Sequence, residues 1–72
     1  MFVIKNVDTE DREFFGWYVK YNPEVGFGLY TINLQDAARF EDKFDAECEL
    51  DGILKEKIVE VIQDEDGNWK EV

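Results

Sequence analysis

A single cysteine and the absence of histidine limit what can hold this chain together. Cys48 has no second thiol to pair with, so no internal disulfide can form within the 72 residues. A structural zinc site needs several cysteine or histidine ligands, which the sequence lacks. The fold must therefore rest on a hydrophobic core, and six Phe, three Tyr and two Trp provide large side chains for it. A lone thiol is also typical of a reducing cytoplasm.

Five segments rich in β-branched and aromatic residues have the composition of strands. They are residues 2–7, 14–21, 27–32, 57–63 and 68–72. Residues 22–26 contain an early proline and a final glycine, which predicts the turn of a hairpin over 14–32. Asp66 and Gly67 predict the two-residue turn of a second hairpin. Aromatic side chains on both faces of 14–21 predict a central place for that strand in the sheet.

Two short helices are predicted between the third and fourth strands. Asn33 is placed to cap a helix over 34–40, and Asp42 is placed to cap a second helix over 43–50. A single bent helix over the same residues fits the pattern nearly as well. One stripe at helical spacing is expected to face the sheet. The stripe consists of Leu34, Ala37, Phe40, Phe44 and Cys48.

Taken together, these elements predict one α+β domain that spans residues 1–72. The expected order is βββααββ, an antiparallel sheet with one or two short helices packed on one face. Phe40 and Phe44 are expected in the core between the helices and the sheet. The sequence contains no repeat, linker or low-complexity stretch that would divide the chain.

The net charge of −10, from 18 acidic and 8 basic residues, restricts the partners. Direct binding to nucleic acid or to an anionic membrane needs a basic surface, so neither is expected. A basic protein partner is favoured, although acidity for solubility alone explains the charge equally well. The N-terminus lacks the basic start and long apolar run of a secretory signal, and no apolar run is long enough to span a membrane. The expected location is therefore the cytoplasm of a host cell.

Catalysis is not expected from this sequence. Cys48 has no histidine to activate it, and the neighbouring Glu47 and Glu49 would raise the pKa of its thiol. Residues 64–67 begin like a calcium loop, but the spacing of the required ligands fails, and a hairpin turn explains them. The prediction is a binding protein with no catalytic residue, cofactor or metal.

The acidic residues gather in the segment 41–51, called here the acidic segment. Lys43 is its one basic residue, and its candidate partner-binding residues are Glu41, Asp42, Asp45, Glu47, Glu49 and Asp51. On a helix, Glu41, Asp45 and Glu49 would form one row about 5–6 Å apart, a spacing that can imitate backbone phosphates. Such a row would bind the basic channel of a nucleic-acid-binding protein. The alternative is a solvated helix face. Two smaller acidic clusters lie at residues 8–13 and 64–66.

The aromatic residues offer a rival interaction surface. Those in and after the predicted hairpin exceed what one small core must bury; they are Trp17, Tyr18, Tyr21, Phe27, Tyr30 and Trp69. If some are exposed, they could anchor a homodimer through a sheet edge. The alternative is that all of them simply fill the core.

A pattern of residues resembles small acidic accessory proteins of phages and prophages. It comprises a tyrosine-bearing hairpin, the run Thr31-x-x-Leu34-x-Asp36-Ala37-x-Arg39-Phe40, then Ala46 and a β-rich tail. The shared residues are structural, with alanines where helix meets sheet and phenylalanine in the core. The resemblance implies a mobile-element origin and no active site. It also implies a possible role as an inhibitor of host defence, such as an anti-CRISPR or anti-restriction protein.

Overall fold

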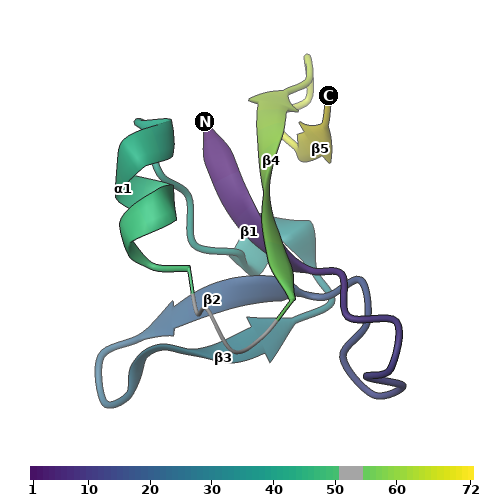
Figure 1. The fold of residues 1–72 in the computed structure, drawn as a ribbon. Coiled ribbons are helices and arrows are strands. Elements are labelled where there is room, and N and C mark those ends of the chain that lie inside the picture. Colours follow the sequence, from purple (N-terminus) through teal and green to yellow (C-terminus); the bar gives the residue numbers. More distant parts are fainter. Residues whose placement is uncertain (51–54) are drawn as a thin grey trace.

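Five antiparallel strands form the framework of the computed structural model, which describes residues 1–50 and 55–72 (Figure 1). In spatial order the sheet reads β3-β2-β1-β4-β5. The strands are β1 (Phe2–Asn6), β2 (Tyr18–Asn22), β3 (Gly26–Thr31), β4 (Glu56–Gln63) and β5 (Trp69–Glu71). Within the described residues, a 3-10 turn, η1 (Leu34–Asp36), and a short helix, α1 (Lys43–Cys48), lie between β3 and β4.

The predicted order βββααββ with helices over 34–40 and 43–50 is wrong. The first helix is only the three-residue η1, although Asn33 caps it as predicted, with its side chain accepting from the Gln35 N–H. From Ala37 onward the backbone is extended, and it forms hydrogen bonds with strands of the sheet instead of within a helix. The Ala38 N–H donates to Val19, and Phe40 exchanges two bonds with Phe2. A helix of seven residues is marginal by itself, so the bonds offered by the sheet decide the conformation.

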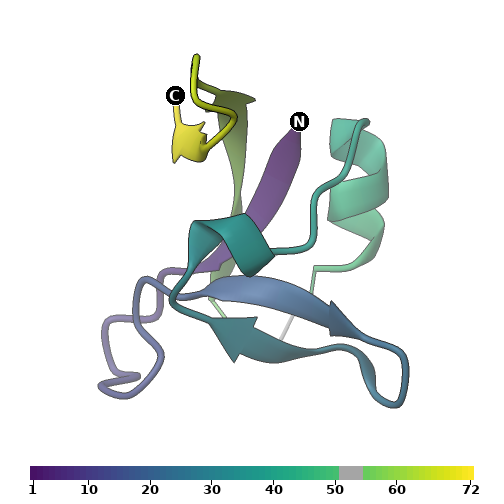
Figure 2. The same cartoon turned by 180° about the vertical axis from the view of Figure 1, so that it is seen from behind.

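Secondary structure also covers both faces of the sheet, which corrects the prediction of helices on one face. Val3 packs in a cluster with Ala37 near η1, whereas the next residue, Ile4, packs with Ala46 of α1. Successive side chains of a strand point to opposite faces, so η1 and α1 lie on opposite sides of β1. Figure 2 shows η1 in front of the sheet, with α1 at its side.

The hairpin predicted over 14–32 is confirmed only from residue 18 onward. β2 and β3 pair with Tyr18 opposite Thr31, and Gly26 adopts the positive φ of 73° that its turn requires. Residues 14–17 instead form the end of a loop. Hydrogen bonds hold this loop, since the carboxylate of Asp11 accepts from the backbone N–H groups of Glu13 and Phe14. Residues 14–21 were predicted to form the central strand, but β1 occupies the middle of the sheet and β2 lies beside it, between β3 and β1.

The outer edge of β5 is closed by a side chain. The amide of Gln35 accepts from the Trp69 N–H at 2.8 Å and donates to the Trp69 carbonyl at 2.9 Å. Arg39 adds a cation–π contact, with its guanidinium carbon 4.9 Å from the Trp69 ring centroid. This short edge strand is therefore held against η1. No helix in the described part of the chain is both long and apolar enough to cross a membrane.

Candidate functional site

The acidic segment begins with a capped helix start. Asp42 is extended, and its carboxylate accepts the backbone N–H of Phe44 at 2.9 Å, as its predicted role of N-cap requires. The helix ends at Glu49, whose backbone N–H returns to the carbonyls of Ala46 and Glu47. α1 is thus a six-residue helix, shorter than the predicted 43–50.

Ala46 is the only residue of α1 that is fully buried. It packs against Ile4 and Val19, and Leu50 packs beside it. Both residues lie off the predicted core stripe, so that stripe is wrong for this helix. The small side chain of Ala46 lets the helix backbone approach the sheet closely.

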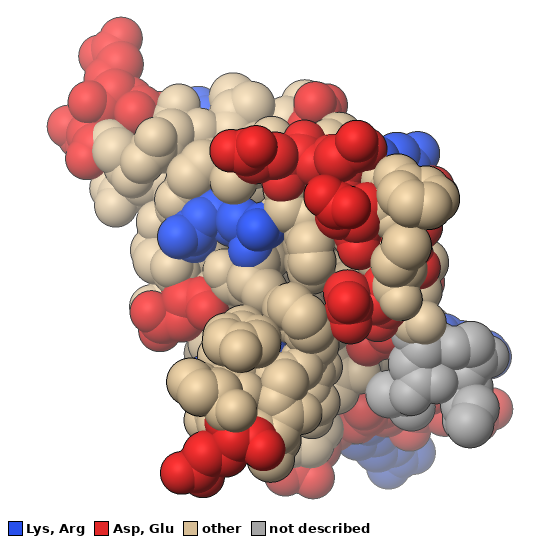
Figure 3. Space-filling model, turned by 90° about the vertical axis from the view of Figure 1, so that its left-hand side faces the viewer, with Lys and Arg blue, Asp and Glu red and all other residues tan. Residues whose placement is uncertain are grey.

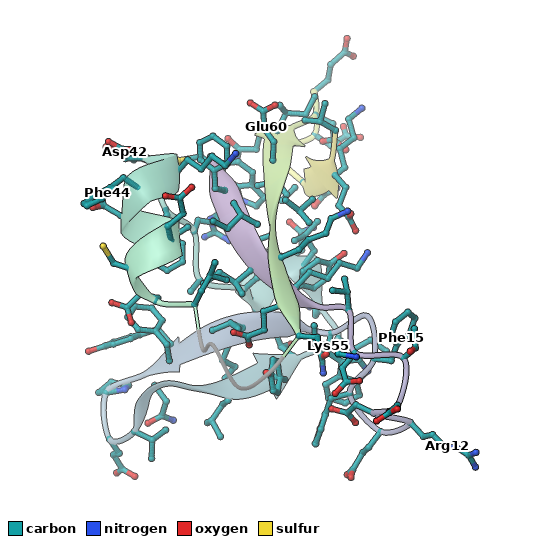
Figure 4. All side chains as sticks on the ribbon, in the orientation of Figure 1. Arg12, Phe15, Asp42, Phe44, Lys55 and Glu60 are labelled. Carbon is teal, nitrogen blue, oxygen red and sulfur yellow. The ribbon has the colours of Figure 1, made fainter. Side chains whose placement is uncertain are left out.

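Phe44, predicted to be in the core, is 66% exposed, and Cys48 is exposed as well. Each lies two residues from Ala46, about 200° around the helix, and therefore on the opposite side of it. Figure 4 shows the side chains of Asp42 and Phe44 pointing away from the sheet. Phe40 is only partly buried, with its ring 5.5 Å from that of Phe27.

All the described acids of the acidic segment are exposed; they are Glu41, Asp42, Asp45, Glu47 and Glu49. Asp51, the sixth predicted residue, lies outside the described residues. The row Glu41, Asp45 and Glu49 is interrupted, because Glu41 precedes the helix cap. Asp45 and Glu49 remain one turn apart, and Glu47 lies on the other flank of α1. The structure therefore groups these acids around the helix rather than along one line (Figure 3).

In the two other acidic clusters, some carboxylates accept hydrogen bonds from nearby backbone N–H groups. Most carboxylates of the acidic segment accept none. In the first loop, Asp8 accepts from the Glu10 N–H, and Asp11 accepts from two backbone N–H groups and from the amide of Asn6. These bonds, above all the one from Phe14, lower the pKa of the Asp11 carboxyl. In the last turn, Asp64 accepts from two backbone N–H groups.

Within the described residues, by contrast, the carboxylates of Glu41, Asp45, Glu47 and Glu49 form no ion pair and accept no side-chain or backbone hydrogen bond. The sequence could not separate the three clusters, since all are short runs of Asp and Glu. Among the described residues, the acidic segment brings four such carboxylates together on and beside one short helix.

A polar cluster joins the C-terminal strand to the centre of the sheet. The Tyr18 hydroxyl donates to Glu71 at 2.5 Å, and Lys5 forms an ion pair with the same carboxylate oxygen at 2.9 Å. Burial, together with this hydrogen bond, raises the pKa of Tyr18 to about 12. The bonds from Tyr18 and Lys5 lower the pKa of Glu71. No sequence signal could have found this cluster, because its members lie far apart in the chain.

The described residues offer few groups that could catalyse a reaction or bind a metal ion. Cys48 is exposed, and no three of their Cys, Asp or Glu residues are grouped as ligands for a metal ion. The 64–67 segment lies in a turn in which Gly67 has a φ of 84°, but β4 ends at Gln63 and β5 begins at Trp69, so the predicted two-residue turn at Asp66 and Gly67 is wrong. A hollow of about 300 Å³ lies at the first loop and is lined by Thr9, Asp11, Arg12 and Phe15. The carboxylate of Asp11 is already bonded within the loop.

Comparison with protein-family models, with curated proteins and with solved structures finds no match to this chain. The resemblance to phage accessory proteins stays a prediction.

Proposed function

We propose that this chain is a non-catalytic binding protein whose acidic segment occupies the basic, nucleic-acid-binding surface of another protein. The observation that supports the proposal is the set of four exposed carboxylates on and beside α1 that have no bonding task within the described fold, namely Glu41, Asp45, Glu47 and Glu49. Asp42 adds a fifth charge, although its carboxylate also caps the helix.

The charge of this surface suits a basic partner. Residues 41–49 carry five carboxylates against Lys43, a net charge of −4 within a chain of −10. Such a concentration of one sign attracts an oppositely charged surface over distance, speeds association and makes binding sensitive to salt. A partner that normally holds the phosphates of DNA or RNA offers the matching array of Lys and Arg.

The proposed role is that of an inhibitor or decoy that competes with nucleic acid. The resemblance to phage accessory proteins makes host defence enzymes, such as CRISPR effectors and restriction enzymes, the first class of partner to test. In that case the site of action is the cytoplasm of the host cell. The chain itself does not contact nucleic acid, because its own surface repels phosphates.

Affinity capture with matched baits tests this proposal. The wild type, the variant Asp45→Asn/Glu49→Gln and the control Glu10→Gln/Glu65→Gln are immobilised and exposed to bacterial lysate. Both variants lose two negative charges at exposed positions, so their net charges are equal. We expect the wild type and the control to retain a nucleic-acid-binding protein that duplex DNA elutes, and the α1 variant to lose it. Equal retention by all three baits would contradict a role for α1.

An exposed apolar surface on the hairpin favours a second candidate function, self-association through the aromatic sheet. Leu29 and Ile32 are 40% and 70% exposed. Residues 14–35 carry only Lys20 and Glu24 as charges, so two copies could meet there despite the net charge of −10. Sedimentation velocity should then show a concentration-dependent dimer that Ile32→Lys abolishes. A monomer at all concentrations would remove this candidate.

A further inference from the structure

An exposed aromatic ring stands at the outer side of the acidic helix. Phe44 is 66% exposed on the side of α1 opposite its only buried residue, Ala46. Asp45 flanks this outer side on one edge of the helix and Glu47 flanks it on the other. A single exposed apolar side chain is common on protein surfaces, but this ring stands between the exposed carboxylates of Asp45 and Glu47. Desolvated aromatic side chains surrounded by polar groups are instead typical anchors of protein interfaces.

A row of aromatic rings continues from the acidic segment toward the hairpin. Phe40, next to Glu41 in the chain, lies 5.5 Å from the ring of Phe27, and Phe27 lies 5.1 Å from the ring of Tyr21. Tyr21 is 56% exposed. Figure 3 shows the carboxylates gathered over α1 and the mostly uncharged surface of the hairpin on the same face of the molecule. Charged and apolar surfaces therefore adjoin.

The charge of this face selects the kind of occupant. A second copy of the chain seated on α1 by two-fold symmetry would bring two sets of five carboxylates together, each with only Lys43 to offset them. A nucleic acid would be repelled in the same way. A basic protein surface is attracted, and only one that also offers an apolar pocket can bury the ring of Phe44.

We propose that Phe44 anchors the partner of the acidic segment, and that this partner is a protein with an apolar pocket rimmed by Lys and Arg. This inference rests on the proposed function, in which the acidic segment binds a basic surface. It adds that recognition is not imitation of phosphates alone: the carboxylates steer the encounter, and the aromatic ring sets the lifetime of the complex.

Two synthetic peptides of equal positive charge test the proposal, an oligolysine and an amphipathic helical peptide of lysine and leucine. The wild type should bind the lysine–leucine peptide about tenfold more tightly, since only this peptide can cover the ring of Phe44. Phe44→Ala should lose that preference and bind oligolysine unchanged. The control Phe15→Ala, an aromatic residue 52% exposed in the first loop, should keep the preference (Figure 4).

The outcomes separate this inference from the proposed function. If Asp45→Asn/Glu49→Gln binds both peptides as tightly as the wild type, the acidic segment is not a binding surface and the proposed function fails. If that double variant binds both peptides more weakly but Phe44→Ala changes the affinity for neither, the carboxylates form the binding surface and Phe44 is not an anchor. A wild-type dimer that Phe44→Ala dissociates would assign the ring to a second copy and overturn the proposal.

Discussion

At the scale of single residues, identical side chains have different tasks that only the tertiary structure assigns. Asp11 and Asp42 each accept backbone N–H groups, whereas Asp45 has no such bond. The caps at Asn33 and Asp42 could be predicted, because a cap depends on local sequence. The exposure of Phe44 could not, because it depends on which side of α1 the sheet covers.

The contrast between Phe40 and Phe44 can be measured directly. Phe40 is partly buried and its ring packs against that of Phe27, so Phe40→Ala should lower the free energy of unfolding by up to about 3 kcal/mol, the lower end of the range for fully buried phenylalanines. Phe44→Ala should change it by less than about 0.5 kcal/mol, as for other surface residues. Urea unfolding of both variants checks this. Equal losses would show that Phe44 also belongs to the core.

The hydrogen bond from Tyr18 to Glu71 should give a pH-dependent contribution to stability. Tyr18→Phe keeps the ring and should cost about 1–2 kcal/mol at pH 7, because it removes a bond to a carboxylate. The pKa of folded Tyr18 is raised from 10.0 to about 12, so the wild type holds this stabilisation below pH 10 and loses it as the pH rises toward 12. The stability difference between the two proteins should therefore shrink above pH 10. A constant difference would show that the phenolic proton is not involved.

At the scale of elements, strands were easier to predict than helices. Alternating β-rich runs and glycine-containing turns located all five strands, with ends displaced by up to four residues. The helix prediction over 34–40 failed because the sheet offers Ala38 and Phe40 backbone partners that no local pattern reveals. The described acids of the acidic segment are exposed, but Glu41 does not continue the row of Asp45 and Glu49, because it precedes the cap of α1.

The cap of α1 can be separated from its charge. Asp42→Asn keeps a side-chain acceptor for the Phe44 N–H and should leave stability within about 0.5 kcal/mol, while Asp42→Ala should cost about 1 kcal/mol. Circular dichroism during thermal unfolding measures both. If the Asn variant lost as much as the Ala variant, the negative charge at the helix start, rather than the acceptor, would stabilise α1.

At the scale of the whole molecule, the chain carries a large excess of negative charge, with 18 acidic against 8 basic residues. The net charge is −10, and the ion pair among the described residues is that of Lys5 with Glu71. Self-repulsion of this size opposes the compact state. The hairpin, with only two charged residues in 14–35, carries almost none of it, so the charge is concentrated elsewhere, most of all near α1.

Screening should therefore stabilise the protein. Raising the salt concentration from about 10 to 150 mM shortens the Debye length from about 30 to 8 Å and should raise the melting temperature. Asp45→Asn/Glu49→Gln should melt at a higher temperature than the wild type at low salt and gain less from added salt. A melting temperature that is independent of salt would show that the acidic segment imposes no repulsion on the folded chain.

Competition with duplex DNA for one captured protein tests the central claim most directly. The dissociation constant of the chain for that protein is measured by titration with and without DNA at a concentration that saturates the protein. If the acidic segment occupies the nucleic-acid-binding surface, the apparent dissociation constant rises in proportion to the DNA concentration, and no ternary complex forms. An unchanged dissociation constant, or a complex that contains all three components, would contradict the claim.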